Sequence, residues 1–496
     1  MIPPRPPADL AGQKSLEYFR AQAPRPNLHP LEKTLLVVVS AQLVFLPWAL
    51  GGMRAWSQFV SLGFSATAFV AALIPRNYYE SAGKLTPLRA YPSRRLLRFP
   101  LFWLGLAFLS YVLTQALNPA WIYETDGKGW WLRRIEDVAW LPSGMITPFS
   151  QSSPWRSLLI DASVWLTVSA LWTGFTRRRT FQLLFTVLAA NAFLLSGVGL
   201  FQRLAGNGKI LGFIDAPASY FVATFIYKNH AAAYLNLLLA LTAGLTYWSF
   251  VRGQRRLERS NPAGIFAFFA TAISVAVLFS YSRGGTILLV VFLVSALAVF
   301  ALHQLRMPAE QRSYFASGMI LLLLVSFVGL GFYSMRLDEV GTRMQALFHE
   351  DRSLSITGRE RMHQATWEMA QDNLAYGWGA GGFRFYFPVY QSRYPEIYAN
   401  GALFWEHAHS DYLETLAEVG LVGSGLIVLM LGYAGWQLSR RNFWRNPLVL
   451  LGSLGLLMTL AHAWFDFPFQ NPAILTTWCV LLVSFIRWAE LEQGPS

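Results

Sequence analysis

The sequence is poor in charge and nearly devoid of cysteine. Only 14% of its 496 residues are Asp, Glu, Lys or Arg, and 54% are hydrophobic, whereas soluble domains carry about 25% charged residues. The single cysteine, Cys479, lies inside an apolar run, so an intramolecular disulfide and a cysteine-based metal site are excluded. No Asp-x-Asp pair occurs, which argues against a metal-dependent sugar-nucleotide transferase. The shortage of charge is explained if most side chains face lipid or other helices.

Apolar runs long enough to cross a bilayer recur along most of the chain. The run from 264 to 302 is too long for one span, and Ser282-Arg283-Gly284-Gly285 divides it as a tight hairpin. The sequence therefore predicts an all-α polytopic membrane protein with about twelve transmembrane helices. We place them at residues 33–50, 57–74, 99–117, 156–174, 181–203, 229–250, 262–281, 285–302, 315–334, 411–436, 447–465 and 472–488.

The net charge of +13 comes from short basic clusters between the apolar runs, a pattern typical of cytoplasmic loops and not of a nucleic-acid-binding surface. The first thirty residues are polar and lack the apolar core of a signal peptide. Both termini are therefore expected in the cytoplasm, and the chain in an inner membrane. The basic loops include 76–98, 177–179, 252–259, 306–312 and 440–445.

The loops on the opposite side include two long segments, 118–155 and 335–410, and long loops usually carry function. The aromatic residues of the first suit a segment at the headgroup level: Trp121, Trp130, Trp131 and Trp140. The predicted division begins with a cytoplasmic tail, residues 1–32, and a membrane domain, residues 33–334, which holds spans one to nine and the periplasmic loop 118–155. A periplasmic catalytic loop, residues 335–410, follows. Spans ten to twelve lie in 411–488, and a cytoplasmic tail covers 489–496.

The end of the loop 335–410 holds the residues best suited to chemistry. Asp411 and Glu414 have the spacing of a capping box, so a helix is expected to start there, just after His409. A helix N-terminus attracts anions, and a neutral histidine is a base near physiological pH. A surface histidine beside an ordinary cap explains the same pattern. Metal binding by His407 and His409 lacks an evident third ligand, and the glycines of 377–382 indicate a tight turn.

Two arginines on the same side are candidates for binding phosphate. Arg283 lies between two spans, where a guanidinium is costly unless it is paired or faces a polar cavity. Arg359 opens a helix predicted at 360–373. Each offers a fork of donors that fits phosphate or diphosphate. The alternatives are a snorkelling hairpin residue for Arg283 and an ordinary surface charge for Arg359.

Five segments in this order resemble the O-antigen ligase and polymerase family of bacterial envelope enzymes. The pattern His-Ser, nine residues, Gly-x-x-Gly from His409 to Gly423 is similar to the ligase signature of that family. The resemblance covers about 225–485, and residues 1–220 match only as apolar spans. The other four segments are Tyr227-Lys228-Asn229-His230, Ser282-Arg283-Gly284-Gly285, the stretch 359–377, and Trp464-Phe465-Asp466-Phe467-Pro468.

The resemblance implies transfer of a saccharide from undecaprenyl pyrophosphate to an acceptor hydroxyl on the periplasmic side, without metal or cofactor. His409 would be the base. Arg283 and Arg359 would hold the pyrophosphate, with Lys228 as a weaker candidate for the same contact and Asp466 for orientation. The partners would be the lipid-linked donor, a lipid or glycan acceptor, and membrane lipids. His363 departs from the family, in which an aromatic residue is common at this position, so the packing of the Arg359 helix is in question.

The motifs do not separate a ligase, which uses a lipid or protein acceptor, from a polymerase, which extends a lipid-linked chain. A transporter or flippase fits twelve spans with both termini inside. However, a transporter built from two halves would have a long cytoplasmic linker near the middle of its sequence. The long loop here lies outside and late in the chain, and the sequence shows no repeated halves. A non-catalytic scaffold is a third possibility, and it predicts that His409 and Arg359 are dispensable.

Overall fold

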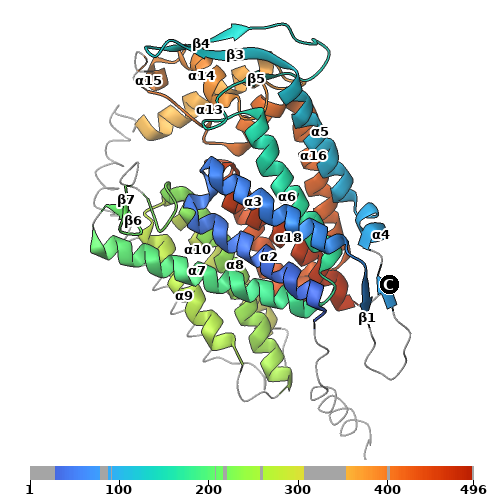
Figure 1. Ribbon diagram of the computed structural model, residues 1–496. Helices are drawn as coiled ribbons and strands as arrows, with labels where there is room; N and C mark the ends of the chain where they lie inside the picture. Colours follow the sequence, from blue (N-terminus) through green and yellow to red (C-terminus); the bar gives the residue numbers. More distant parts are fainter. Residues whose placement is uncertain are drawn as a thin grey trace, which may run out of the picture.

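The computed structural model describes residues 28–78, 88–90, 92–206, 208–215, 221–256, 261–305, 354–398, 401 and 403–493. The predicted span 315–334, most of the predicted N-terminal tail, the last three residues of the predicted C-terminal tail and the first part of the predicted loop 335–410 lie outside these residues. Most of the described chain is helical (Figure 1).

A bundle of long apolar helices forms the larger part of the molecule (Figure 1). Among the described residues, nine helices have the length and composition of a membrane span, and α9 and α17 are apolar but shorter. Each predicted run that falls on described residues coincides with a helix, which confirms a polytopic membrane protein. The helices are α2 (Pro30–Trp48), α3 (Ala55–Leu73), α5 (Pro100–Leu117), α6 (Pro154–Gly174), α7 (Arg178–Ala205), α8 (Lys228–Arg256), α9 (Ala263–Phe279), α10 (Arg283–Leu305), α16 (Asp411–Arg440), α17 (Pro447–His462) and α18 (Pro472–Gln493).

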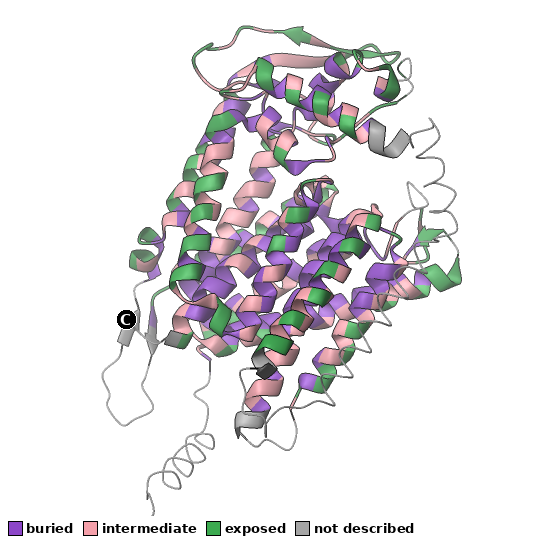
Figure 2. Cartoon of the chain, turned by 180° about the vertical axis from the view of Figure 1, so that it is seen from behind, coloured by how far each residue is buried: buried purple, intermediate pink, exposed green. Residues whose placement is uncertain are grey.

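Helix α8 lies in the middle of this bundle. The consecutive residues Leu238, Leu239 and Ala240 point to different sides of α8 and are each at most 1% exposed, as expected for a helix that is apolar all round. It packs against α9 and α17, and α10 also contacts it. Figure 2 shows the buried residues concentrated along the inner helices, with exposed residues on the outer ones. The first turn of α8 is thereby held in a fixed place at one end of the bundle.

A smaller unit, here called the cap, covers that end (Figure 1). It contains α13 (Leu354–Asp372), α14 (Phe383–Gln391) and α15 (Pro395–Tyr398), and a sheet of β3 (Pro119–Thr125), β4 (Trp130–Arg134) and β5 (Gly144–Ile146). The strand order is β4-β3-β5, with β4 antiparallel and β5 parallel to β3.

The prediction of an all-α fold is wrong for the segment 118–155, because its aromatic residues form a sheet that packs on α14. The rings of Trp121 and Tyr386 are 6.0 Å apart, and those of Tyr123 and Phe385 are 5.4 Å apart. Residues two apart on β3 point to the same face, so Trp121 and Tyr123 both reach the cap core. Trp140, by contrast, is 74% exposed.

The end of the bundle opposite the cap gathers the basic clusters. Arg178 at the start of α7 forms an ion pair with Glu492 near the end of α18, at 3.1 Å, and lies over the Trp488 ring. The small elements here are β1 (Arg76–Tyr78) paired with β2 (Leu88–Ala90), α4 (Pro92–Leu97) and η4 (Phe443–Arg445). The other small elements are η1 (Leu50–Gly52), η5 (Pro468–Gln470), and β6 (Lys209–Ile210) paired with β7 (Ile214–Asp215).

The cap is attached where α16 is interrupted at Gly420, which has φ 61° and ψ −167°. Only glycine adopts this conformation readily. The amide of Gly379 donates to the Glu418 carbonyl at 2.9 Å, and that of Leu421 to the Leu374 carbonyl at 2.8 Å. A Cβ on Gly377 would lie 2.4 Å from the Glu418 backbone. The glycines of 377–382 therefore allow this segment to pass in direct contact with the backbone of α16. Glycine is required at 420, the first position of the Gly-x-x-Gly pattern, because the two backbones are in contact there.

Candidate functional site

His409 lies between the cap and the bundle, one residue before the N-cap of α16. Its φ of 49° is positive, a conformation uncommon for residues other than glycine. Nδ1 of His409 lies 3.6 Å from Oδ1 of Asp466, longer than an ordinary hydrogen bond but within ion-pair range. No hydrogen bond occupies Nε2 within the described part of the chain. The ring is thus oriented by a carboxylate at one nitrogen and available at the other.

Asp466 follows α17 and is 2% exposed. Its carboxylate accepts hydrogen bonds from the side-chain amide of Asn229 and from the backbone amide of Phe467, the latter at 2.9 Å. Burial by itself would raise the pKa of this carboxyl, but the imidazoles of His409, His462 and His230 outweigh it and lower the pKa to about 2. Asp466 is therefore a fixed negative charge beside His409.

Phe467 brings the elements of the site together. Its ring stacks on Tyr227 with centroids 5.4 Å apart and on His407 at 4.5 Å, and it meets the edges of His230 at 5.0 Å and His409 at 4.9 Å. One buried ring thus contacts the segment before α8 and the segment before α16. This contact fixes where the histidine loop sits relative to the first turn of α8.

His407 is held differently from His409. Nδ1 of His407 lies 2.8 Å from a carboxylate oxygen of Glu414, whose other oxygen accepts from the Ala408 amide at 2.8 Å. Burial opposes protonation, but Glu414 outweighs it and raises the pKa of His407. The predicted capping box is wrong in detail, because Glu414 binds this preceding turn and the N-cap is Ser410, which forms no side-chain cap bond. The helix itself does begin at Asp411.

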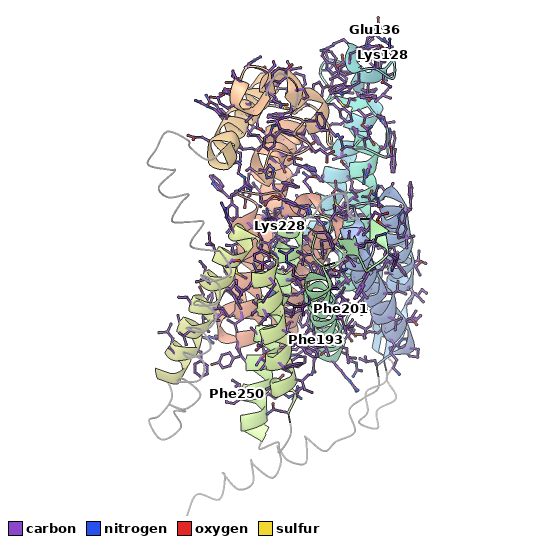
Figure 3. The ribbon with its side chains drawn as sticks, turned by 90° about the vertical axis from the view of Figure 1, so that its left-hand side faces the viewer. Lys128, Glu136, Phe193, Phe201, Lys228 and Phe250 are labelled. Atoms are coloured by element: carbon purple, nitrogen blue, oxygen red, sulfur yellow. The ribbon has the colours of Figure 1, made fainter. Side chains whose placement is uncertain are left out.

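Three of the predicted basic residues lie close to one another. Lys228 and Arg283 are the first residues of α8 and α10, and the positive charges of Arg283, Arg203 and Arg359 all act on Lys228. None of these four side chains has an ion pair among the described residues. Figure 3 places Lys228 where the bundle meets the cap, far from Phe250 on the same helix. Clustered cations without acidic partners are suited to an anion carrying several charges.

The turn before Arg283 differs from the prediction. It comprises residues 280–282, and Gly284 and Gly285 lie inside the first turn of α10, which Ser282 caps by accepting from the Gly285 amide at 3.2 Å. A Cβ on Gly284 would lie 2.4 Å from the Phe465 ring, and one on Gly285 would lie 2.4 Å from Ala232. The two glycines therefore allow α10 to approach α8 and the Asp466 segment.

Arg359 lies in the second turn of α13, which starts at Leu354 and not at the predicted residue 360. One turn later, Nε2 of His363 donates to the backbone carbonyl of His409 at 3.1 Å. Burial lowers the pKa of His363, consistent with a neutral ring that donates through Nε2. His363, which replaces the aromatic residue expected from the family pattern, thus connects α13 to the His409 segment.

The sequence prediction missed several residues that the fold brings to the site. Asn229 and Phe467 bind or flank Asp466, and Arg203 joins the basic cluster. His462 is 1% exposed and lies 3.9 Å from Asp466, and within the described part of the chain neither of its ring nitrogens has a hydrogen-bond partner. Asn229 and Phe467 stand inside motifs already singled out, whereas no local pattern distinguishes Arg203 or His462.

The fold and this site define a polytopic membrane protein with a polar, mostly cationic site at one end of its helices. Residues 265–428, about a third of the chain, match the family model described as O-antigen ligase. Over these residues the chain is similar to the O-antigen ligase family, in agreement with the resemblance of its motifs. The matched region includes Arg283, Arg359 and His409, whereas Lys228 and Asp466 lie outside it. No curated protein matches the chain.

The similarity of residues 265–428 to this family supports a ligase or glycosyltransferase type of enzyme that acts on glycan or lipid-linked substrates in a membrane. Within the described residues, no three His, Cys, Asp or Glu side chains are grouped as metal ligands.

Proposed function

We propose that this protein transfers a saccharide from undecaprenyl diphosphate to an acceptor hydroxyl, without a metal ion, at the periplasmic face of the bacterial inner membrane. One observation carries this proposal. A histidine oriented by a buried carboxylate lies in the same region as basic residues that have no acidic partner within the described ranges. This combination supplies a base for the acceptor and charge stabilisation for a diphosphate leaving group.

The proposed reaction balances without any further reactant. Nε2 of His409 takes the proton of the acceptor hydroxyl, whose oxygen forms a bond to the anomeric carbon of the first sugar. The bond from that carbon to the diphosphate oxygen breaks, and its electron pair leaves with undecaprenyl diphosphate. Arg283 and Arg359 stabilise the charge that develops on the leaving group. Asp466 stabilises the imidazolium formed on His409, and Lys228 adds a further positive charge.

The proposed orientation rests on charge. The basic clusters described here lie at the end opposite the cap, and basic residues between spans favour the cytoplasm. The cap and His409 are then periplasmic. A lipid-linked donor reaches such a site from the outer leaflet, with its diphosphate at the level of the first turns of α8 and α10.

Labelling of introduced cysteines tests this orientation. In a Cys479→Ala background, Ser392→Cys in the cap is expected to react with a membrane-impermeant thiol reagent in intact spheroplasts, because Ser392 is exposed. The same result is expected for Ser353→Cys, although residue 353 lies outside the described part. Ser439→Cys, near the basic end of α16, is the control and should react only after lysis. The opposite pattern would reverse the orientation and remove the periplasmic site.

The role of Arg283 is tested by a change that retains its charge. Arg283→Lys is expected to lower transfer about tenfold or more, because an ammonium cannot replace the two-pronged contact of a guanidinium with phosphate. The measurement is transfer from a purified undecaprenyl diphosphate-linked glycan to its acceptor, by protein in nanodiscs. Arg133→Lys is a matched control in the cap, where Arg133 pairs with Glu124 at 2.8 Å. Equal transfer by both variants would favour a snorkelling role for Arg283.

Ligation and polymerisation both remain compatible with this site, since they differ in the acceptor and not in the leaving group. A glycan profile of a deletion strain separates them: loss of chain length indicates polymerisation, and loss of attachment indicates ligation. The alternative of a lipid or polysaccharide transporter has less support. It gives no role to a histidine held by a buried carboxylate next to a cluster of cations.

A further inference from the structure

A cavity of about 190 Å³ lies beside the basic cluster and plays no part in the mechanism above. It is lined by the last turns of α7, the end of α9 and residues 221–222. Its lining combines two polar side chains with apolar ones: Gln202, Arg203, Leu200, Phe221, Val222 and Phe279. A mixed lining of this kind is typical of sites that bind small ligands.

Gln202 is the first indication of a ligand. The residue is 9% exposed, and among the described residues neither its amide oxygen nor its amide nitrogen has a hydrogen-bond partner. A buried amide left unpaired destabilises a fold, so such groups are rare in native structures and call for an explanation. Because Gln202 lines the cavity, a bound molecule there would satisfy it.

Arg203 connects the cavity to the donor site. Its guanidinium lies 4.4 Å above the Tyr281 ring, in the turn that leads into Arg283. Its charge also acts on Lys228. No ion pair neutralises Arg203 within the described ranges. The cavity therefore has a cation at the edge that faces the basic cluster, and apolar side chains of α7 and α9 elsewhere.

We infer that this cavity binds the lipid-proximal end of the donor, namely the phosphate next to the polyprenyl chain together with its first isoprene unit. Arg203 and the Gln202 amide contact the phosphate oxygens, and Leu200, Val222 and Phe279 contact the branched hydrocarbon. The inference rests on the proposed function, and it adds a contact on the lipid side of the diphosphate. Arg359, on α13 of the cap, then contacts the phosphate next to the sugar.

Binding of undecaprenyl monophosphate tests this assignment, since that lipid carries only the lipid-proximal phosphate. The full chain in nanodiscs is titrated with undecaprenyl monophosphate, undecaprenyl diphosphate and phosphatidylglycerol. Arg203→Gln is expected to weaken binding of both prenyl phosphates about tenfold or more, the loss of a charge-assisted contact. Arg359→Gln is expected to weaken binding of the diphosphate and to leave the monophosphate near the wild-type affinity.

Gln202→Leu separates a loss of ligand binding from a loss of folding. Leucine has a similar volume and removes two unpaired polar atoms, so the variant should be at least as stable as the wild type. It is nevertheless expected to bind undecaprenyl monophosphate less tightly. Arg440→Gln is the matched control, because Arg440 also lies over an aromatic ring, Trp436 at 5.4 Å, at the opposite end of the bundle.

Two results would overturn the inference. One is wild-type affinity for undecaprenyl monophosphate in both Arg203→Gln and Gln202→Leu. The other is an equal loss of phosphatidylglycerol binding, which would make the cavity a general site for lipid phosphates. Either result leaves the proposed function intact if Arg283→Lys still lowers transfer. Conversely, absence of transfer by the wild-type protein would defeat the proposed function even if Arg203 controls prenyl phosphate binding.

Discussion

Replacement of His409 by alanine is expected to reduce glycan transfer by about 10²–10⁴-fold, the usual contribution of a positioned general base. An acceptor hydroxyl is a poor nucleophile until its proton is removed, and the Nε2 atom of His409 has no competing partner in the described structure. Donor binding is expected to persist, because Arg283 and Arg359 hold the diphosphate. Transfer and donor binding are therefore measured separately, with purified protein in nanodiscs. A wild-type transfer rate would make the base assignment wrong and favour a scaffold.

His407→Ala is the matched control in the same loop. We expect its effect on transfer per folded molecule to be small, since His407 is held by Glu414, whereas the carboxylate of Asp466 orients His409. Its effect should be on stability. Glu414 raises the pKa of His407, so the stabilisation is fully present below about pH 6.5 and is lost as the pH rises through the folded-state pKa. Thermal unfolding of the two proteins should thus differ most at low pH.

Asp466→Asn is expected to lower transfer by about 10²-fold or more, by analogy with other carboxylates that orient a catalytic histidine. An asparagine side chain retains the size of Asp466 but removes the negative charge that favours a proton on Nδ1. With its pKa lowered to about 2, Asp466 stays ionised at neutral pH. The deficit should therefore persist across pH 5–9, which a pH–rate profile of both proteins measures.

Asp411→Asn provides the control for that change. Asp411 lies in the adjoining turn and accepts from the Phe469 amide at 2.9 Å, without contacting His409. If both variants lose transfer equally, Asp466 contributes to the local fold and not specifically to His409. Loss confined to Asp466→Asn supports its role as a positioning residue, and rescue by Asp466→Glu would strengthen it.

Features encoded in short stretches of sequence could be predicted well. Long apolar runs predict helices wherever they occur, because burial of apolar surface and hydrogen bonding within one segment depend on nearby residues only. The start of α16 at Asp411 and the break between α9 and α10 belong to this class. The observed boundaries differ from the predicted ones by a few residues. Gly284 and Gly285, for example, lie within α10 and allow its close packing, and they are not part of the turn. The segment 118–155 was misjudged, since its aromatic residues gain a partner only once α14 is in place.

The sequence by itself determined the class of protein, its apolar helices and the motifs that hold His409, Arg283 and Arg359. Tertiary structure alone decided that Asp466 and Phe467 stand against His409, that Arg203 joins the cations near Lys228, and that Gly420 interrupts α16. The physical reason is distance along the chain. Hydrophobicity and helix capping act between neighbouring residues, whereas these contacts form only after α8, α16 and α17 pack together, and no local pattern records which distant side chains that packing brings within a few ångströms.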